Sequence, residues 1–188
     1  MHSISHHPSN HWWNSIKSLA VFAEIKRASP SRGDISPFAC APSTALVYSN
    51  AGASVISVLT EEKYFKGSLR DLSLARAMFK EKRPCILRKD FIVDRYMVLE
   101  SRIAGADCIL LIVAMLKKDV LIDLIEYTRS LGMEPLVEVV DETEMQVACD
   151  AGAVVVGINN RNLHSFEVDM GKTGRAAKGK TEGFKIIV

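Results

Sequence analysis

The chain has 188 residues, of which 48% are hydrophobic and 24% are charged, and its formal net charge is +2 at pH 7. This length and composition predict one globular domain with a substantial apolar core. Lysine and arginine are spread along the chain, so we expect neither nucleic acid nor a membrane as a partner. The longest apolar run, residues 108–116, is too short to span a bilayer.

Cysteine and histidine do not form the patterns typical of disulfide frameworks or metal sites. The four cysteines lack C-x-x-C spacing, and three of them lie in apolar runs, which favours buried free thiols. Most histidines fall among Ser, Asn and Pro in residues 1–19, where we expect a flexible tail and a short helix stub. We therefore expect a reducing compartment and no bound metal.

Residues 20–188 are predicted to form a single domain in which strands and helices alternate. The expected strands, each an apolar run, are residues 20–26, 54–59, 84–87, 107–113, 134–140 and 154–159, with a seventh beginning at 184–188. The expected helices begin near Pro42, Ser68, Asp94, Asp119 and Asp141, and Ser or Asp serves as the N-cap of the last four. This alternation predicts a parallel sheet with right-handed crossovers.

A short repeat bears on how this sheet is arranged. Ala-Gly-Ala occurs at residues 51–53, 104–106 and 151–153, each time between an expected helix and an even-numbered strand. Glycine there supplies the left-handed turn that ends a helix. A period of two βα units suits a (β/α)₈ barrel, in which alternate strands fill alternate layers. The repeat does not exclude an open, doubly wound sheet.

Charged residues accompany the odd-numbered strands. Glu24 and Lys26 lie in the first strand, Lys89 follows the third, and Glu138 is surrounded by Leu and Val in the fifth. Desolvation changes the proton affinity of such groups, as acid and base catalysis requires. Three successive odd strands that bring charge to the sheet interior indicate an acid–base site. The alternatives are a structural ion-pair network or, for Lys89 alone, a solvated charge at a strand end.

Other candidate residues follow the strands. The loop that contains Ser29 is rich in turn residues and could bind an anion, or it could be only a turn. Asn159 and Arg161 end the sixth strand, where they either orient a substrate or cap a helix. Phe65 and Phe91 lie in loops after strands, where they could pack on a flat ring or simply on the protein. Neither a Walker motif nor G-x-G-x-x-G is present, so nucleotide binding has no support.

Five segments, in order, resemble indole-3-glycerol phosphate synthases. They are residues 23–31 (AEIKRASPS), 59–65 (LTEEKYF), 87–92 (LRKDFI), 134–138 (EPLVE) and 157–163 (GINNRNL). The likeness extends over residues 22–169. The resemblance implies a (β/α)₈ barrel enzyme of tryptophan biosynthesis, a lyase that converts 1-(2-carboxyphenylamino)-1-deoxyribulose 5-phosphate with loss of carbon dioxide and water. It implies a small phosphorylated substrate and no cofactor or metal.

The resemblance also implies roles for the candidate residues. Lys89 would be the general acid for ring closure, and Glu138 the general base for the later dehydration. Lys26 would bind the anthranilate carboxylate, with Glu24 beside it. Ser29 would contact phosphate.

The remaining roles implied by the resemblance concern the substrate. Asn159 and Arg161 would position it or support the catalytic carboxylates, and Phe65 and Phe91 would flank its aromatic ring. The family's pathway implies a cytoplasmic location, or the plastid stroma in a photosynthetic eukaryote. Fusion to other enzymes of the pathway is a further expectation.

The chain departs from the family pattern after Asp169. Residues 171–180 contain three glycines, and the family's later Glu-Ser-Gly segment, eighth strand and last helices are absent from the sequence. We therefore expect an incomplete barrel of about six βα units and the start of a seventh strand, with low or no activity alone. A complementing segment is one possible partner. Alternatives are an inactive barrel that acts as a binding or assembly partner, and another phosphate-binding barrel such as a sugar-phosphate isomerase.

Overall fold

The computed structural model describes residues 20–80, 83–159 and 185–187, and within them one large sheet dominates. Its seven strands are parallel to their neighbours and follow one another around the sheet in chain order. They are β1 (Phe22–Ile25), β4 (Val55–Leu59), β5 (Cys85–Lys89), β6 (Cys108–Ile112), β7 (Glu134–Val139), β8 (Val155–Ile158) and β9 (Lys185–Ile187). The predicted parallel sheet is confirmed, including its seventh strand.

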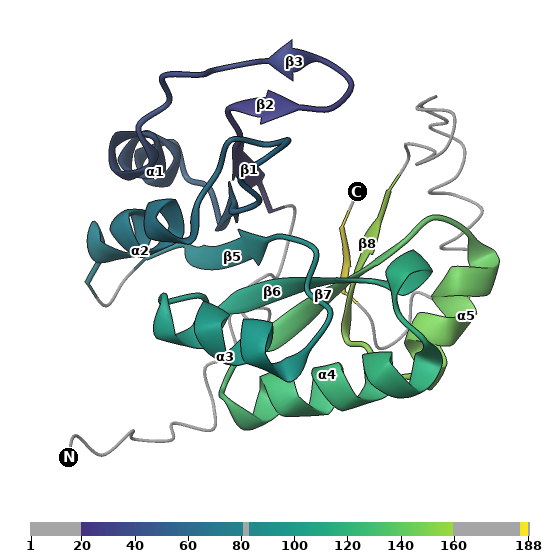
Figure 1. Ribbon diagram of the computed structural model, residues 1–188. Helices are drawn as coiled ribbons and strands as arrows, with labels where there is room; N and C mark the ends of the chain where they lie inside the picture. The colour runs from purple at the N-terminus through teal and green to yellow at the C-terminus, as the bar shows by residue number, and fades with distance from the viewer. Residues whose placement is uncertain (1–19, 81–82, 160–184, 188) are drawn as a thin grey trace.

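Helices connect these strands and lie along the outer side of the curved sheet (Figure 1). They are α1 (Ala41–Asn50), α2 (Leu69–Ala77), α3 (Arg95–Ile103), α4 (Lys118–Ser130) and α5 (Glu142–Asp150), with a short 3₁₀ turn, η2 (Val113–Met115), before α4. No helix in the described ranges has the length and apolar character needed to cross a membrane. The loop after β1 contains a small antiparallel hairpin, β2 (Ala28–Ser29) and β3 (Gly33–Asp34), which the sequence did not predict.

The N-caps are mostly as predicted. The side chains of Ser68, Asp94 and Asp141 each accept a hydrogen bond from a backbone N–H in the first turn of α2, α3 and α5. The expectation for α4 was wrong, because the N-cap is Lys117 and Asp119 lies within the first turn. An acidic residue inside the first turn still interacts favourably with the helix dipole, which is why it resembles a cap in the sequence.

The glycines of the Ala-Gly-Ala repeat adopt the left-handed backbone conformation that the repeat predicted. The φ angles of Gly52, Gly105 and Gly152 are +89°, +99° and +78°. At each of these turns the chain leaves a helix and enters β4, β6 or β8. The repeat therefore marks every second strand.

Two separate cores distinguish a barrel from an open sheet. One core lies between the sheet and the helices and includes Ile56, Ile86 and Leu124. The other contains only strand residues and their flanks, among them Leu87, Leu110 and Leu136. Helices cover both faces of a doubly wound sheet, whereas the inner face of a barrel packs against itself. The described strands therefore form an incomplete (β/α)₈-type barrel, as predicted, in which the strand order runs from β1 to β9.

Candidate active site

Strand register aligns Glu24 on β1 with Lys89 on β5. Glu24 pairs with Ser57 of β4, which pairs with Leu87 of β5, so Lys89 is two residues further along its strand. In an eight-stranded barrel of shear eight, second-neighbour strands are staggered by about two residues. Glu24 and Lys89 therefore belong to one layer of side chains inside the barrel.

The same stagger brings Glu138 of β7 into this layer. Leu87 pairs through Cys108 with Glu134, so Lys89 is level with Leu136, and Glu138 lies two residues beyond. The charged residues of three successive odd strands thus meet at one level, near the carboxyl ends of the strands. Active sites of (β/α)₈ barrels occur at this end.

A triad of side chains occupies the β1–β5 side of the layer. The Lys89 Nζ donates to Glu24 Oε2 at 2.6 Å, and the Lys26 Nζ donates to Glu24 Oε1. Burial raises the pKa of the Glu24 carboxyl, but the charge of Lys89 and hydrogen bonds from both lysines outweigh this effect and lower it. Glu24 is therefore ionised at neutral pH and holds two ammonium groups beside each other.

The carboxylate of Glu138 has a polar partner on the adjacent strand. Asn159, directly after β8, donates a hydrogen bond from Nδ2 to Glu138 Oε1 at 3.1 Å. Both side chains are half-buried. Asn159 thus fixes the orientation of the carboxylate.

Two loops beyond the strand ends bring an aromatic pair together. The ring centroids of Phe65 and Phe91 are 6.3 Å apart and the rings are tilted by 56°. The Phe65 carbonyl also accepts a hydrogen bond from the Ala28 N–H, which links this loop to the loop after β1. Ser29 follows in the β2–β3 hairpin and is buried. Arg161 lies outside the described residues.

The arrangement is suited to proton transfer on a substrate held inside the barrel mouth. Lys89 presents a proton donor and Glu138 a proton acceptor in the same layer, and Lys26 adds a second cation. In the described ranges, no group of three or more His, Cys, Asp or Glu gathers as metal ligands do. Acid and base on separate rigid strands is an arrangement that enzymes use for paired proton transfers.

A sequence profile of the indole-3-glycerol phosphate synthase family matches residues 8–187, which is nearly the whole chain. The chain belongs to this family. A multifunctional tryptophan biosynthesis protein of Schizosaccharomyces pombe is 57% identical over 161 residues, covering 85% of this chain and 21% of that protein. An indole-3-glycerol phosphate synthase of Rhodococcus opacus is 50% identical over 169 residues, covering 89% of this chain and 62% of the relative.

Solved structures with low sequence identity support the barrel fold. A 3-keto-L-gulonate-6-phosphate decarboxylase from Vibrio cholerae superposes with a TM-score of 0.64 at 14% identity, covering 89% of this chain and 76% of the other. A 3-hexulose-6-phosphate synthase gives 0.56 at 12% identity, covering 74% and 64%. At such identities the likeness shows the fold alone.

The structure adds residues that the sequence did not single out. Arg88 and Asp90 flank Lys89 but face the helices, where Thr60 joins them through hydrogen bonds. The signal was present in the alternation of the strand, which turns Arg88 away from the side chain of Lys89. The sequence does not show which face of this strand forms the barrel interior, so it could not tell which of the two side chains points inward. The roles implied by the family therefore do not account for the polar group that Thr60, Arg88 and Asp90 form on the helix side of β5.

Proposed function

We propose that this chain catalyses the indole-3-glycerol phosphate synthase reaction on 1-(2-carboxyphenylamino)-1-deoxyribulose 5-phosphate. The observation that supports this most directly is the single layer that contains Lys89, held by Glu24, and Glu138, held by Asn159. Because the chain spans about a fifth of its fungal relatives and about three fifths of its bacterial ones, the activity of those proteins is carried over here as a proposal.

Ring closure is the step assigned to the triad. The ammonium of Lys26 binds the carboxylate on the aromatic ring, beside Glu24. Lys89 donates a proton to the ketose carbonyl oxygen while the ring carbon bonds to the carbonyl carbon. The bond to the carboxylate then breaks, carbon dioxide leaves, and the electron pair restores the aromatic ring. Glu24 keeps the donor in place because it is ionised.

Dehydration is the step assigned to Glu138. The Glu138 carboxylate takes the proton from the neighbouring nitrogen-bearing carbon, while the hydroxyl formed in the first step takes a proton from the Lys26 ammonium and leaves as water, so that a double bond forms. Asn159 holds one oxygen of this carboxylate throughout. Opposed acid and base groups allow both proton transfers to proceed near neutral pH.

Substrate binding is assigned to the surrounding loops. Phe65 and Phe91, whose rings already lie close together, flank the aromatic ring of the substrate. Ser29 contacts its phosphate, and Arg161 positions the substrate or supports the catalytic carboxylates. These assignments rest on the family motifs together with the placement of the phenylalanines.

The setting of the protein is part of the same proposal. Relatives named as multifunctional tryptophan biosynthesis proteins support fusion to, or association with, other enzymes of that pathway. The free thiols of Cys85 and Cys108, buried in the barrel, support a reducing compartment. We propose the cytoplasm, or the plastid stroma in a photosynthetic eukaryote.

Single-turnover kinetics with the enzyme in excess tests the proposal, with indole fluorescence as the measure of product. The chain should form product at the low rate expected of an incomplete barrel, and Lys89→Met should reduce this rate by roughly 10²- to 10⁴-fold, because the proton donor is lost. The matched control is Lys118→Met on α4, which removes an exposed ion pair with Asp150 and should leave the rate unchanged. An equal rate in Lys89→Met would overturn the proposal, and no product from the unaltered chain would favour the inactive-barrel alternative over it.

A further inference from the structure

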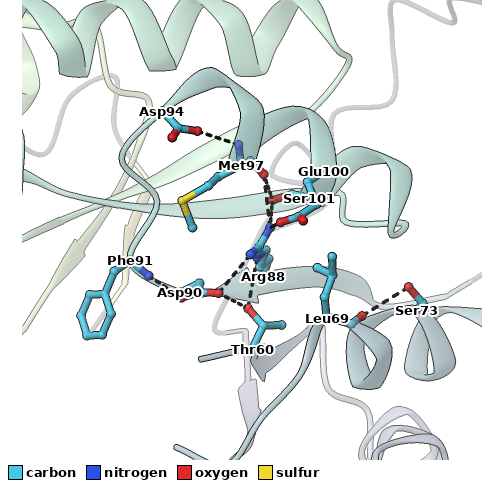
Figure 2. A network of polar contacts seen from close by, with 10 residues as sticks. All are labelled: Thr60, Leu69, Ser73, Arg88, Asp90, Phe91, Asp94, Met97, Glu100 and Ser101. Atoms are coloured by element: carbon cyan, nitrogen blue, oxygen red, sulfur yellow. Dashed lines mark hydrogen bonds and ion pairs between the residues drawn. The ribbon is translucent and has the colours of Figure 1, made fainter. Parts of the chain in front are cut away.

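A buried guanidinium organises the helix side of the strand that carries Lys89. Figure 2 shows Arg88 at the centre of a polar network between the end of β5 and helix α3. Its side chain is only 5% exposed, although arginine is rarely buried without partners. Its partners come from three segments of the chain. They are Thr60 after β4, Asp90 after β5, and the Met97 carbonyl, Glu100 and Ser101 on α3.

All three nitrogens of the Arg88 guanidinium donate hydrogen bonds. Nε donates to Thr60 Oγ1 at 3.1 Å, and Nη2 donates to Asp90 Oδ2 at 3.1 Å. Nη1 donates to Glu100 Oε2 at 2.8 Å and to Ser101 Oγ at 3.1 Å. The Thr60 hydroxyl donates in turn to Asp90 Oδ2 at 2.5 Å. A network with this many mutual contacts has one favoured geometry.

The network holds the backbone on both sides of Lys89. Arg88 and Asp90 are its immediate neighbours, and the Lys89 carbonyl accepts a hydrogen bond from the Thr60 N–H at 3.2 Å. Asp90 Oδ1 accepts from the Phe91 N–H at 2.8 Å, which sets the turn that aims the Phe91 ring. The active-site lysine and the aromatic residue that follows it are thus tied to one buried group of side chains.

Thr60 is the residue on which this linkage depends most. Its hydroxyl accepts from Arg88 and donates to Asp90, and its backbone N–H donates to Lys89. It lies 4% exposed, on the opposite side of β5 from the site. Loss of the hydroxyl would leave Arg88 Nε without this acceptor and Asp90 Oδ2 without this donor.

We propose that Thr60, Arg88 and Asp90 are positioning residues, which act through the backbone of β5 to place the Lys89 ammonium against Glu24 and the Phe91 ring over the substrate. The inference rests on the proposed function for its kinetic consequence, but the placement of Lys89 can be measured without turnover. Mispositioning a catalytic group by about 1 Å lowers rates by roughly 10²-fold, so a distant hydroxyl can matter to catalysis.

The test compares two substitutions at Thr60 with a matched one elsewhere. Thr60→Val removes the hydroxyl and keeps the shape, whereas Thr60→Ser keeps the hydroxyl. Thr128→Val on α4 removes a hydroxyl that is also buried and donates to the Leu124 carbonyl at 2.6 Å. Below all melting temperatures, Thr60→Val should lower the single-turnover rate by roughly 10- to 100-fold. Thr60→Ser and Thr128→Val should stay within about threefold of the unaltered chain.

A second readout separates this inference from the proposed function. The side-chain ¹³C signal of Lys89, assigned by its loss in Lys89→Arg, is followed through a pH titration in each variant. Its titration curve should shift in Thr60→Val and stay in place in Thr60→Ser and Thr128→Val. Two results overturn the inference: an unshifted curve in Thr60→Val, or an unchanged rate in that variant when the unaltered chain is active. If the unaltered chain makes no product but the curve shifts, the proposed reaction fails and the positioning role stands.

Discussion

Glu24 is the residue whose protonation state organises the site. Its two carboxylate oxygens accept hydrogen bonds from Lys26 and Lys89, and these contacts come from positions two residues and two strands away. Burial alone would raise the pKa of this carboxyl, but the two cations outweigh that effect and lower the pKa below its ordinary value. The same residue therefore contributes to stability and to the placement of the Lys89 side chain.

Acid stability reports on this carboxylate. Because the pKa of Glu24 is lowered by folding, its contribution to stability is present above the unfolded value and is lost as the pH falls through the folded value. The thermal midpoint of the unaltered chain should fall between about pH 7 and about pH 3, and that of Glu24→Gln should fall less. Circular dichroism melts at both pH values give the comparison. An equal fall in both proteins would show that Glu24 makes no such contribution.

At the residue scale, the charged positions Glu24, Lys89 and Glu138 could be found in the sequence, because charge at the end of an apolar strand is conspicuous. The partners could not be assigned in the same way. The pairing of Lys89 with Glu24 depends on the stagger between β1 and β5, and the contact between Asn159 and Glu138 depends on the register of β8 against β7. The sequence did not single out Arg88, because one residue of alternation decides whether a side chain faces the helices or the barrel interior.

At the scale of elements, the turns before β4, β6 and β8 were more predictable than the helix faces. Tyr96, Leu99 and Ile103 share one side of α3, yet that side is exposed and Val98 and Ser101 face the core instead. Hydrophobic periodicity alone assigns the wrong face when a polar network, here that of Arg88, occupies the inner one. The glycine turns carry a backbone requirement that tertiary context does not change.

The glycine turns allow a matched comparison. A Cβ added at Gly52 would meet nothing within 4 Å, whereas one at Gly105 would lie 2.6 Å from Arg76 Cγ. Gly52→Ala should lower the free energy of unfolding by roughly 1–2 kcal/mol through left-handed strain alone. Gly105→Ala should lower it further, because Arg76 must also move from its hydrogen bond to the Phe79 carbonyl. Urea unfolding measures both, and a smaller loss at Gly105 would contradict this reading of the turn.

At the scale of the whole molecule, strand order follows from the alternation of elements, since each helix returns the chain to a neighbouring parallel strand. The choice between a barrel and an open sheet needed the structure. All of α1 to α5 pack on the face that contains Ile56 and Ile86, and the opposite face packs on itself through residues such as Leu87 and Leu136. The packing of this inner face on itself is what brings β1, β5 and β7 to one site.

The most direct test of the whole account is a rapid-quench experiment that follows carbon dioxide release and indole formation separately. Lys89 is assigned to ring closure and Glu138 to the later dehydration, so the two substitutions should differ in kind. Lys89→Met should slow both products by the same factor. Glu138→Gln should release carbon dioxide faster than it forms the indole, whereas Glu142→Gln, an exposed control on α5, should change neither. Parallel loss of both products in Glu138→Gln, or an unaffected indole rate, would contradict the assignment of base to Glu138.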